Sequence, residues 1–135
     1  MKVYDPDQTI NPAEWNMLDE DERQYLVERY HRKKRIKMPN SRVHAVFHVI
    51  VENQVALGTE IPAQKTLERL MGEGPGRHDD VHAIASVLAG HMFDLMKHGA
   101  KDKDVNAIYN RRLEELTAES WLRSANKELE EEDPE

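Results

Sequence analysis

The chain has 135 residues, a formal net charge of −7 and no cysteine. This length predicts one domain with a buried core, and the absence of cysteine excludes disulfides and thiolate-bound metals. The negative charge argues against a general nucleic-acid-binding protein, and no apolar run is long enough to span a bilayer. Because the first residues lack the apolar segment of a secretory signal, we expect a cytoplasmic protein.

Helix signals begin after an extended arm over residues 1–10. Asn11, which is followed by proline, predicts a capped helix start. Asp19 then begins a longer helix with an acidic first turn, and the basic run at residues 32–35 suits the C-terminal end of its dipole.

Residues 41–58 form the most apolar stretch of the chain. The run is longer than most strands and has no period-two alternation, so it predicts a buried helix. Asn40 or Ser41 suits the N-cap, and Gly58 suits the position just after the last helical residue.

The same signals predict further helices at residues 62–71, 77–98 and 105–116, with a final helix beginning near Thr117. Short connections between neighbouring helices favour antiparallel packing. The sequence therefore predicts an all-α, up-and-down helical bundle of about five to six helices. We expect a single domain over residues 1–126 and an acidic, disordered tail at 127–135.

Histidines recur at a four-residue spacing on the two most apolar helices. His44, His48 and Glu52 lie on the first, and His78 and His82 on the second. Residues four apart share a helix face, so two packed helices can close these side chains around one ion or two. Imidazole and carboxylate ligands without sulfur predict iron, zinc or manganese. Whether the protein is an enzyme stays open, because a sequence does not reveal an open coordination position.

The alternative is that the histidines are structural and close a buried hydrogen-bond network. The chain would then be a non-enzymatic interaction or oligomerisation module, which contacts a second copy or a partner protein. Met92, Phe93 and Met96 would supply the apolar surface for that contact.

Two other histidines on the helix at 77–98 are not predicted to join this metal site. His91 follows His82 by nine residues, about 180° around the helix, so one site cannot use both. With Asp94, His91 predicts a second polar cluster or a dimer contact. His98 precedes a glycine and is predicted to interact with the C-terminal end of the helix dipole.

The order His31, His48-x3-Glu52 and His78-x3-His82 resembles the ligand order of the hemerythrin family. That family is a four-helix bundle holding two irons bridged by carboxylates and oxygen. The resemblance implies iron ligands at these five positions. The chain departs from the family in the last helix, where its His-x4-Asp motif has no counterpart.

Between residues 15 and 121 the chain also resembles a bacterial family of small helical proteins classed as a domain of unknown function. The resemblance is carried by residues 15–23, 49–54 and 78–88. It implies a bacterial helical protein and no particular activity.

Overall fold

The computed structural model describes residues 1–35, 40–58, 62–74, 76–99 and 104–123, and within these ranges it has helices and no strand. The all-α prediction is confirmed, whereas the tail expected at 127–135 lies outside the described residues. The helices are α1 (Pro12–Met17), α2 (Glu20–Lys33), α3 (Ser41–Ala56), α4 (Pro62–Glu73), α5 (Arg77–His98) and α6 (Val105–Glu115), and residues 118–123 are again helical.

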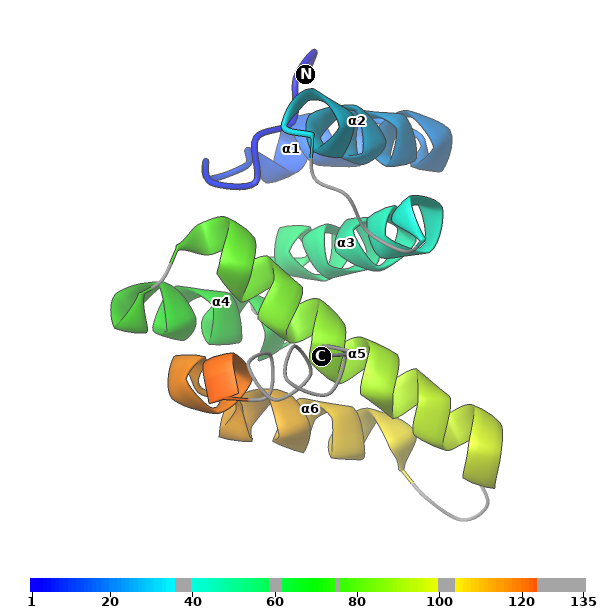
Figure 1. Ribbon diagram of the computed structural model, residues 1–135, viewed down its shortest axis with the longest axis vertical. Helices are drawn as coiled ribbons and strands as arrows, with labels where there is room; N and C mark the ends of the chain where they lie inside the picture. The colour runs from blue at the N-terminus through cyan, green and yellow to red at the C-terminus, as the bar shows by residue number, and fades with distance from the viewer. Residues whose placement is uncertain (36–39, 59–61, 75, 100–103, 124–135) are drawn as a thin grey trace, which may run out of the picture.

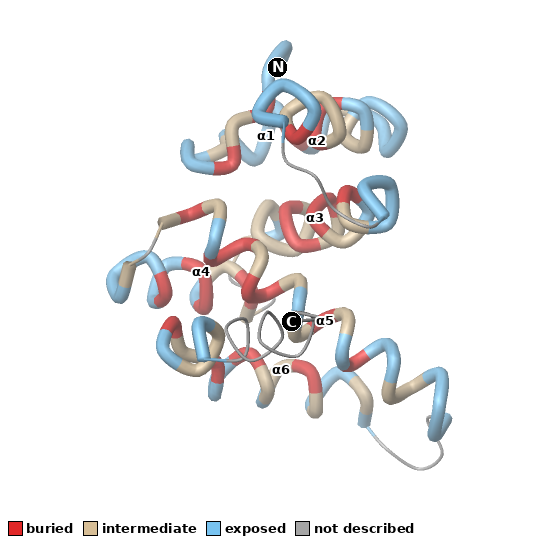
Figure 2. Tube along the Cα trace, in the orientation of Figure 1, coloured by how far each residue is buried: buried red, intermediate tan, exposed pale blue. Residues whose placement is uncertain are grey.

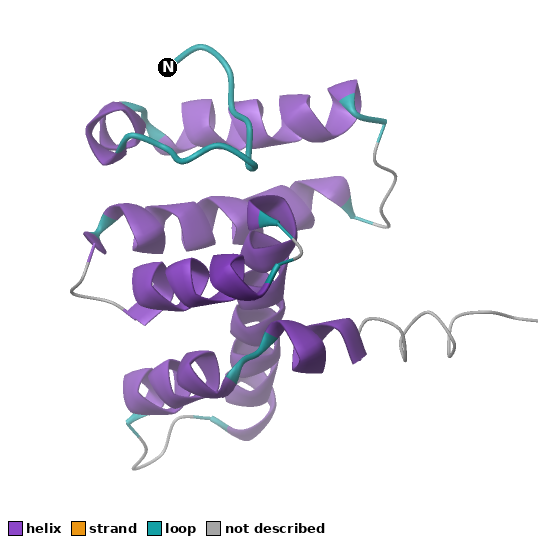
Figure 3. Cartoon of the chain, turned by 90° about the vertical axis from the view of Figure 1, so that its left-hand side faces the viewer, coloured by secondary structure: helices purple, strands orange, loops and turns teal. Residues whose placement is uncertain are grey.

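The helices stack in layers around α3. The N-terminal arm, α1 and α2 lie on one side of α3, and α4 and α6 lie on the other (Figure 1). A view from the side shows α5 running steeply across these layers (Figure 3). Helix α3 packs against α1, α2, α4 and α5, which confirms it as the central helix. Its first turns are more open than predicted, because Val43 and Val46 are exposed.

Side chains at the helix starts explain where the helices begin. The side chain of Asn11 accepts hydrogen bonds from two backbone amides of α1, and that of Asn40 accepts one from the amide of Val43 in α3. Asp19 and Glu22 form a reciprocal capping box at the start of α2. These contacts satisfy amides that have no partner inside the helix. At the other end of α3, Gly58 has a φ of 79°, a conformation that glycine adopts without a steric penalty.

The apolar interior has two parts, which meet at α3. The first part joins the arm, α1, α2 and one side of α3, and its buried residues are Tyr4, Trp15, Leu26, Val27, Ala45 and Val49. The second joins the other side of α3 to α4, α5 and α6, and it includes Val51, Leu67, Leu70, Val81, Ile84, Leu88 and Leu113. Burial of this kind is the main favourable contribution to folding.

Helix α5 is buried over its N-terminal half and open toward its C-terminal end (Figure 2). Met92, Phe93 and Met96 are 40%, 63% and 85% exposed, so the apolar surface expected from the sequence is present. Among the helices described, none is long and apolar enough to cross a membrane.

Candidate metal centre

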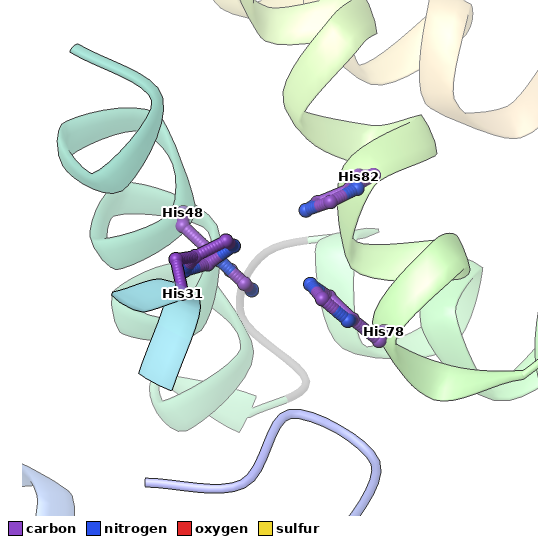
Figure 4. A group of neighbouring side chains, drawn as sticks. All are labelled: His31, His48, His78 and His82. Atoms are coloured by element: carbon purple, nitrogen blue, oxygen red, sulfur yellow. The ribbon is translucent and has the colours of Figure 1, made fainter. Parts of the chain in front are cut away.

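Four histidines from three helices converge between α2, α3 and α5. His31 comes from α2, His48 from α3, and His78 and His82 from α5 (Figure 4). One ring nitrogen from each lies within 4.8 Å of those from the other three. A tetrahedral zinc ion holds its ligand nitrogens roughly 3.3 Å apart, so small ring movements would bring these four into a coordination sphere.

Helix geometry explains how the cluster is assembled. His78 and His82 are one turn apart on α5 and therefore point to the same side, toward α3. His48 meets them from α3, which packs closely against α5. His31 closes the group from the last turn of α2. His48 and His31 are only 0% and 4% exposed, so little water can solvate their rings.

Three buried ring nitrogens in this cluster have no hydrogen-bond partner among the described residues: His31 Nε2, His48 Nδ1 and His78 Nε2. Buried polar atoms are nearly always paired, so each such atom requires an explanation. For His31, the hydrogen bond of the other ring nitrogen shows which nitrogen carries the proton. Its Nδ1 lies 2.8 Å from the carbonyl oxygen of Val27. A carbonyl only accepts, so a neutral His31 has its proton on Nδ1 and a free lone pair on Nε2.

A chain of buried side chains connects His48 to a charged pair. Its Nε2 lies 2.9 Å from the hydroxyl oxygen of Tyr4, and this hydroxyl donates to Glu52 Oε2 at 2.5 Å. Arg77 donates to both carboxylate oxygens of Glu52, each at 2.8 Å. Burial, together with the neighbouring negative charge of Glu52, raises the pKa of Tyr4 well above its usual value. The phenol therefore keeps its proton.

Burial favours the neutral form of His44, His48, His78 and His82. It lowers the pKa of His44 to about 4 and that of His82 to about 3, and repulsion between neighbouring histidines adds to the effect. The pKa values of His48 and His78 are lowered as well, chiefly by burial. Neutral rings offer lone pairs, and these are what a metal ion requires from histidine.

Of the five ligands predicted from the residue spacing, the structure brings three into the group: His48, His78 and His82. Glu52 is buried but lies outside the group, because Arg77 and Tyr4 occupy its carboxylate. His44 lies at the edge of the group, with its Nε2 3.0 Å from Nε2 of His82. One of these two nitrogens must donate and the other accept.

The fourth member, His31, was implied by the hemerythrin resemblance and not by a paired spacing, because no second histidine lies one turn away on α2. Two other contributors were missed. Tyr4 lies in an arm without periodicity, and Arg77 follows a glycine-rich turn. The one sequence feature that could have pointed to them is that each is a large side chain, aromatic in Tyr4 and cationic in Arg77, within an otherwise polar segment.

The remaining polar candidates lie apart from the four histidines. His91 packs against the ring of Tyr109, with 5.4 Å between the ring centres, and Asp94 pairs with Arg112 at 2.8 Å. A separate cavity of about 230 Å³ is lined by His91, Asp94, His98 and Arg112. The predicted second polar cluster on α5 therefore has a physical counterpart, built with an arginine from α6.

Asp80 lies between His78 and His82 in sequence but is directed away from them, because residues two apart lie about 200° from each other around a helix. Its Oδ2 is buried without a hydrogen-bond partner in the described part of the chain. Burial raises the pKa of this carboxyl to about 6, helped by the charges of Asp79 and Glu73. Asp80 therefore takes no part in the histidine group.

Comparisons with known proteins give no relative for this site: no family model, no curated protein and no solved structure matches the chain. The resemblance to a bacterial family of unknown function stays a prediction.

Proposed function

We propose that this protein binds one divalent transition-metal ion through His31, His48, His78 and His82. The observation that carries the proposal is the convergence of four histidines, three of which have a buried ring nitrogen without a hydrogen-bond partner among the described residues. Neutral imidazoles that only face one another would leave these lone pairs buried at a cost of about 1–3 kcal/mol each. A cation at their centre would satisfy all of them at once.

The ligand chemistry favours zinc. Four neutral imidazoles suit zinc, copper, nickel and iron, whereas manganese prefers oxygen ligands. Glu52, the one carboxylate that the spacing offered as a ligand, is already held by Arg77. Of the three metals expected from the sequence, zinc therefore fits the nitrogen ligands best, iron is second and manganese is least favoured.

Four protein ligands fill a tetrahedral coordination sphere, which is typical of structural zinc sites and not of catalytic ones. An ion bound here would join α2, α3 and α5, the helices that supply the histidines. We therefore propose a metal-stabilised helical protein. An enzymatic role would require one ligand to leave or an additional coordination position to open.

The test is elemental analysis of the full chain, purified without a histidine tag or chelator. We expect about one zinc ion per chain in the wild type and none in the His48→Ala, His82→Ala double variant. His98→Ala is the matched control, because His98 is exposed and lies outside the group. Absence of metal from the wild type, together with failed reconstitution with zinc, iron, copper and nickel, would overturn the proposal.

A second candidate function is self-association through the exposed end of α5. The observation that favours it is the large exposed fraction of Met92, Phe93 and Met96 on one helix. Large apolar side chains grouped on a surface are typical of protein contacts. Sedimentation of the wild type and of a Phe93→Ser, Met96→Ser variant tests this function. Identical monomeric sedimentation of both proteins would argue against it.

A further inference from the structure

We infer that Tyr4 is a positioning residue, which holds His48 in the tautomer whose lone pair is on the buried, unpartnered Nδ1. The inference rests on the proposed metal site and assigns a role to the N-terminal arm. It follows from which atom donates and which accepts in each hydrogen bond between Arg77 and His48.

Arg77 donates one hydrogen bond to each oxygen of Glu52, so both oxygens act as acceptors and the carboxylate is ionised. Tyr4 donates its single hydroxyl proton to Oε2 of the same carboxylate. The hydroxyl oxygen can then only accept from the ring of His48, which lies 2.9 Å away.

The proton of neutral His48 must therefore be on Nε2, and Nδ1 carries the lone pair. This Nδ1 is the buried atom that has no hydrogen-bond partner among the described residues. The direction of the hydrogen bonds assigns the tautomer, and the atom that it leaves with a lone pair is the unpartnered one. In metal sites a histidine ligand commonly donates its second N–H to an oxygen in this way, which fixes its tautomer and orientation.

Burial and packing make the arrangement rigid. Tyr4 is 1% exposed, so water does not compete for its hydroxyl. Two neighbouring residues of the arm are bound to the first turn of α5: Arg77 donates to the carbonyl of Pro6, and the amide of His78 donates to Asp7 Oδ1. The arm is therefore attached to the site at three successive points.

The two histidines with defined tautomers differ in an informative way. His31 donates to the carbonyl of Val27, four residues earlier on its own helix, so its tautomer needs no distant partner. His48 depends on Tyr4, which is 44 residues away in the sequence. Correct ligation through Nδ1 thus requires the arm to be in place. Because coupling of this kind is reciprocal, metal binding should hold the arm more firmly against α3 and α5.

The test uses the full chain and compares Tyr4→Phe with Tyr30→Phe. Tyr30 is a suitable control because its ring also packs against the cluster, with centre distances of 5.4 Å to His31 and 5.3 Å to His78. Nitrogen-15 NMR of the metal-free proteins reports which nitrogen of His48 carries the proton. Competition with a chromophoric chelator then measures zinc affinity.

We expect the wild type and Tyr30→Phe to carry the His48 proton on Nε2. Tyr4→Phe should lose this preference and bind zinc about 10- to 100-fold more weakly, as is typical when a partner of a ligand is removed. A wild-type His48 protonated on Nδ1 overturns the inference, even if the variant does not fold. An unchanged zinc affinity in Tyr4→Phe also overturns it. Failure of the wild type to bind any metal overturns the proposed function instead, and the NMR result separates the two cases.

Discussion

Arg77 and Glu52 form an ion pair in which both side chains are almost completely buried, at 4% and 1% exposed. The pair is bidentate, with two hydrogen bonds of 2.8 Å. A buried pair of this geometry depends on both partners, because the remaining charge is costly to leave alone in the interior. The role of Glu52 is therefore to hold Arg77 and Tyr4 in place beside the histidines.

This relationship predicts that Glu52→Ala destabilises the metal-free protein. Removal of one partner from a buried ion pair typically costs about 3–5 kcal/mol in the free energy of unfolding. Urea unfolding in the presence of a chelator measures the change. Glu119→Ala is the control. Glu119 and Arg123 also form an ion pair, but their side chains are 82% and 74% exposed, so this pair should contribute little to stability. If Glu52 acted only as a metal ligand, its loss would leave the metal-free protein nearly unaffected.

Zinc should stabilise the folded protein. A ligand that binds only the folded state adds about 2.7 kcal/mol when its free concentration is 100 times its dissociation constant. Thermal unfolding with and without zinc measures the shift in midpoint. His31→Ala should abolish the shift, because it removes one of the four ligands. His98→Ala should retain it. A full shift in His31→Ala would show that zinc binds elsewhere.

Stability of the metal-free protein should fall as the pH is lowered. The pKa of His44 is lowered to about 4 and that of His82 to about 3, against 6.5 for an ordinary histidine. Between these values the unfolded chain binds protons that the folded protein excludes. Stability is therefore complete above pH 6.5 and decreases toward pH 4. Each histidine contributes a slope of up to about 1.4 kcal/mol per pH unit.

Asp80 acts in the opposite direction, since its pKa is raised from 3.8 to about 6 and the folded state holds an additional proton between these values. Four lowered histidines outweigh this single carboxyl. The measurement is urea unfolding of the metal-free protein from about pH 8 to about pH 4.5, repeated with Asp80→Asn, which should show the steeper loss. A flat profile in the wild type would contradict the assignment of neutral, buried histidines.

His44→Ala should keep one metal ion per chain. His44 contacts His82 but does not belong to the group of four converging nitrogens. Its removal should weaken zinc binding by about tenfold, the lower end of the effect expected when a partner of a ligand is lost. His82→Ala should instead lose most of the bound metal. Elemental analysis and chelator competition on both variants make the comparison. Equal losses would make His44 a ligand.

Much of the fold could be predicted from local patterns. The helix starts at Asn11, Asp19 and Asn40 depend on side chains that bond to amides two or three residues away, so a short window of sequence contains the whole interaction. The long apolar run at 41–58 identified the central helix for the same reason. The exposure of Val43 and Val46 could not be foreseen, because it depends on which neighbouring helices reach the first turns of α3.

The site was predictable only where its members lie one turn apart on one helix. His78 and His82 meet this condition, and His48 was found through its spacing from His44 and Glu52. The spacing does not reveal what each side chain contacts, so Glu52 was predicted as a ligand although Arg77, 25 residues away, holds its carboxylate. The contact of Tyr4 with His48 could not be predicted for the same reason, since no local sequence pattern connects the arm to α3.

The two-part apolar interior has a consequence for how the chain loses its structure. The part around Trp15 and Val27 and the part around Leu70 and Ile84 share α3, which also carries His48. Without metal, the arm, α1 and α2 could detach while the second part stays folded, which is partial unfolding in contiguous units. An ion bound by α2, α3 and α5 would oppose this separation. A single metal atom would then decide whether the protein unfolds in two steps or in one cooperative transition.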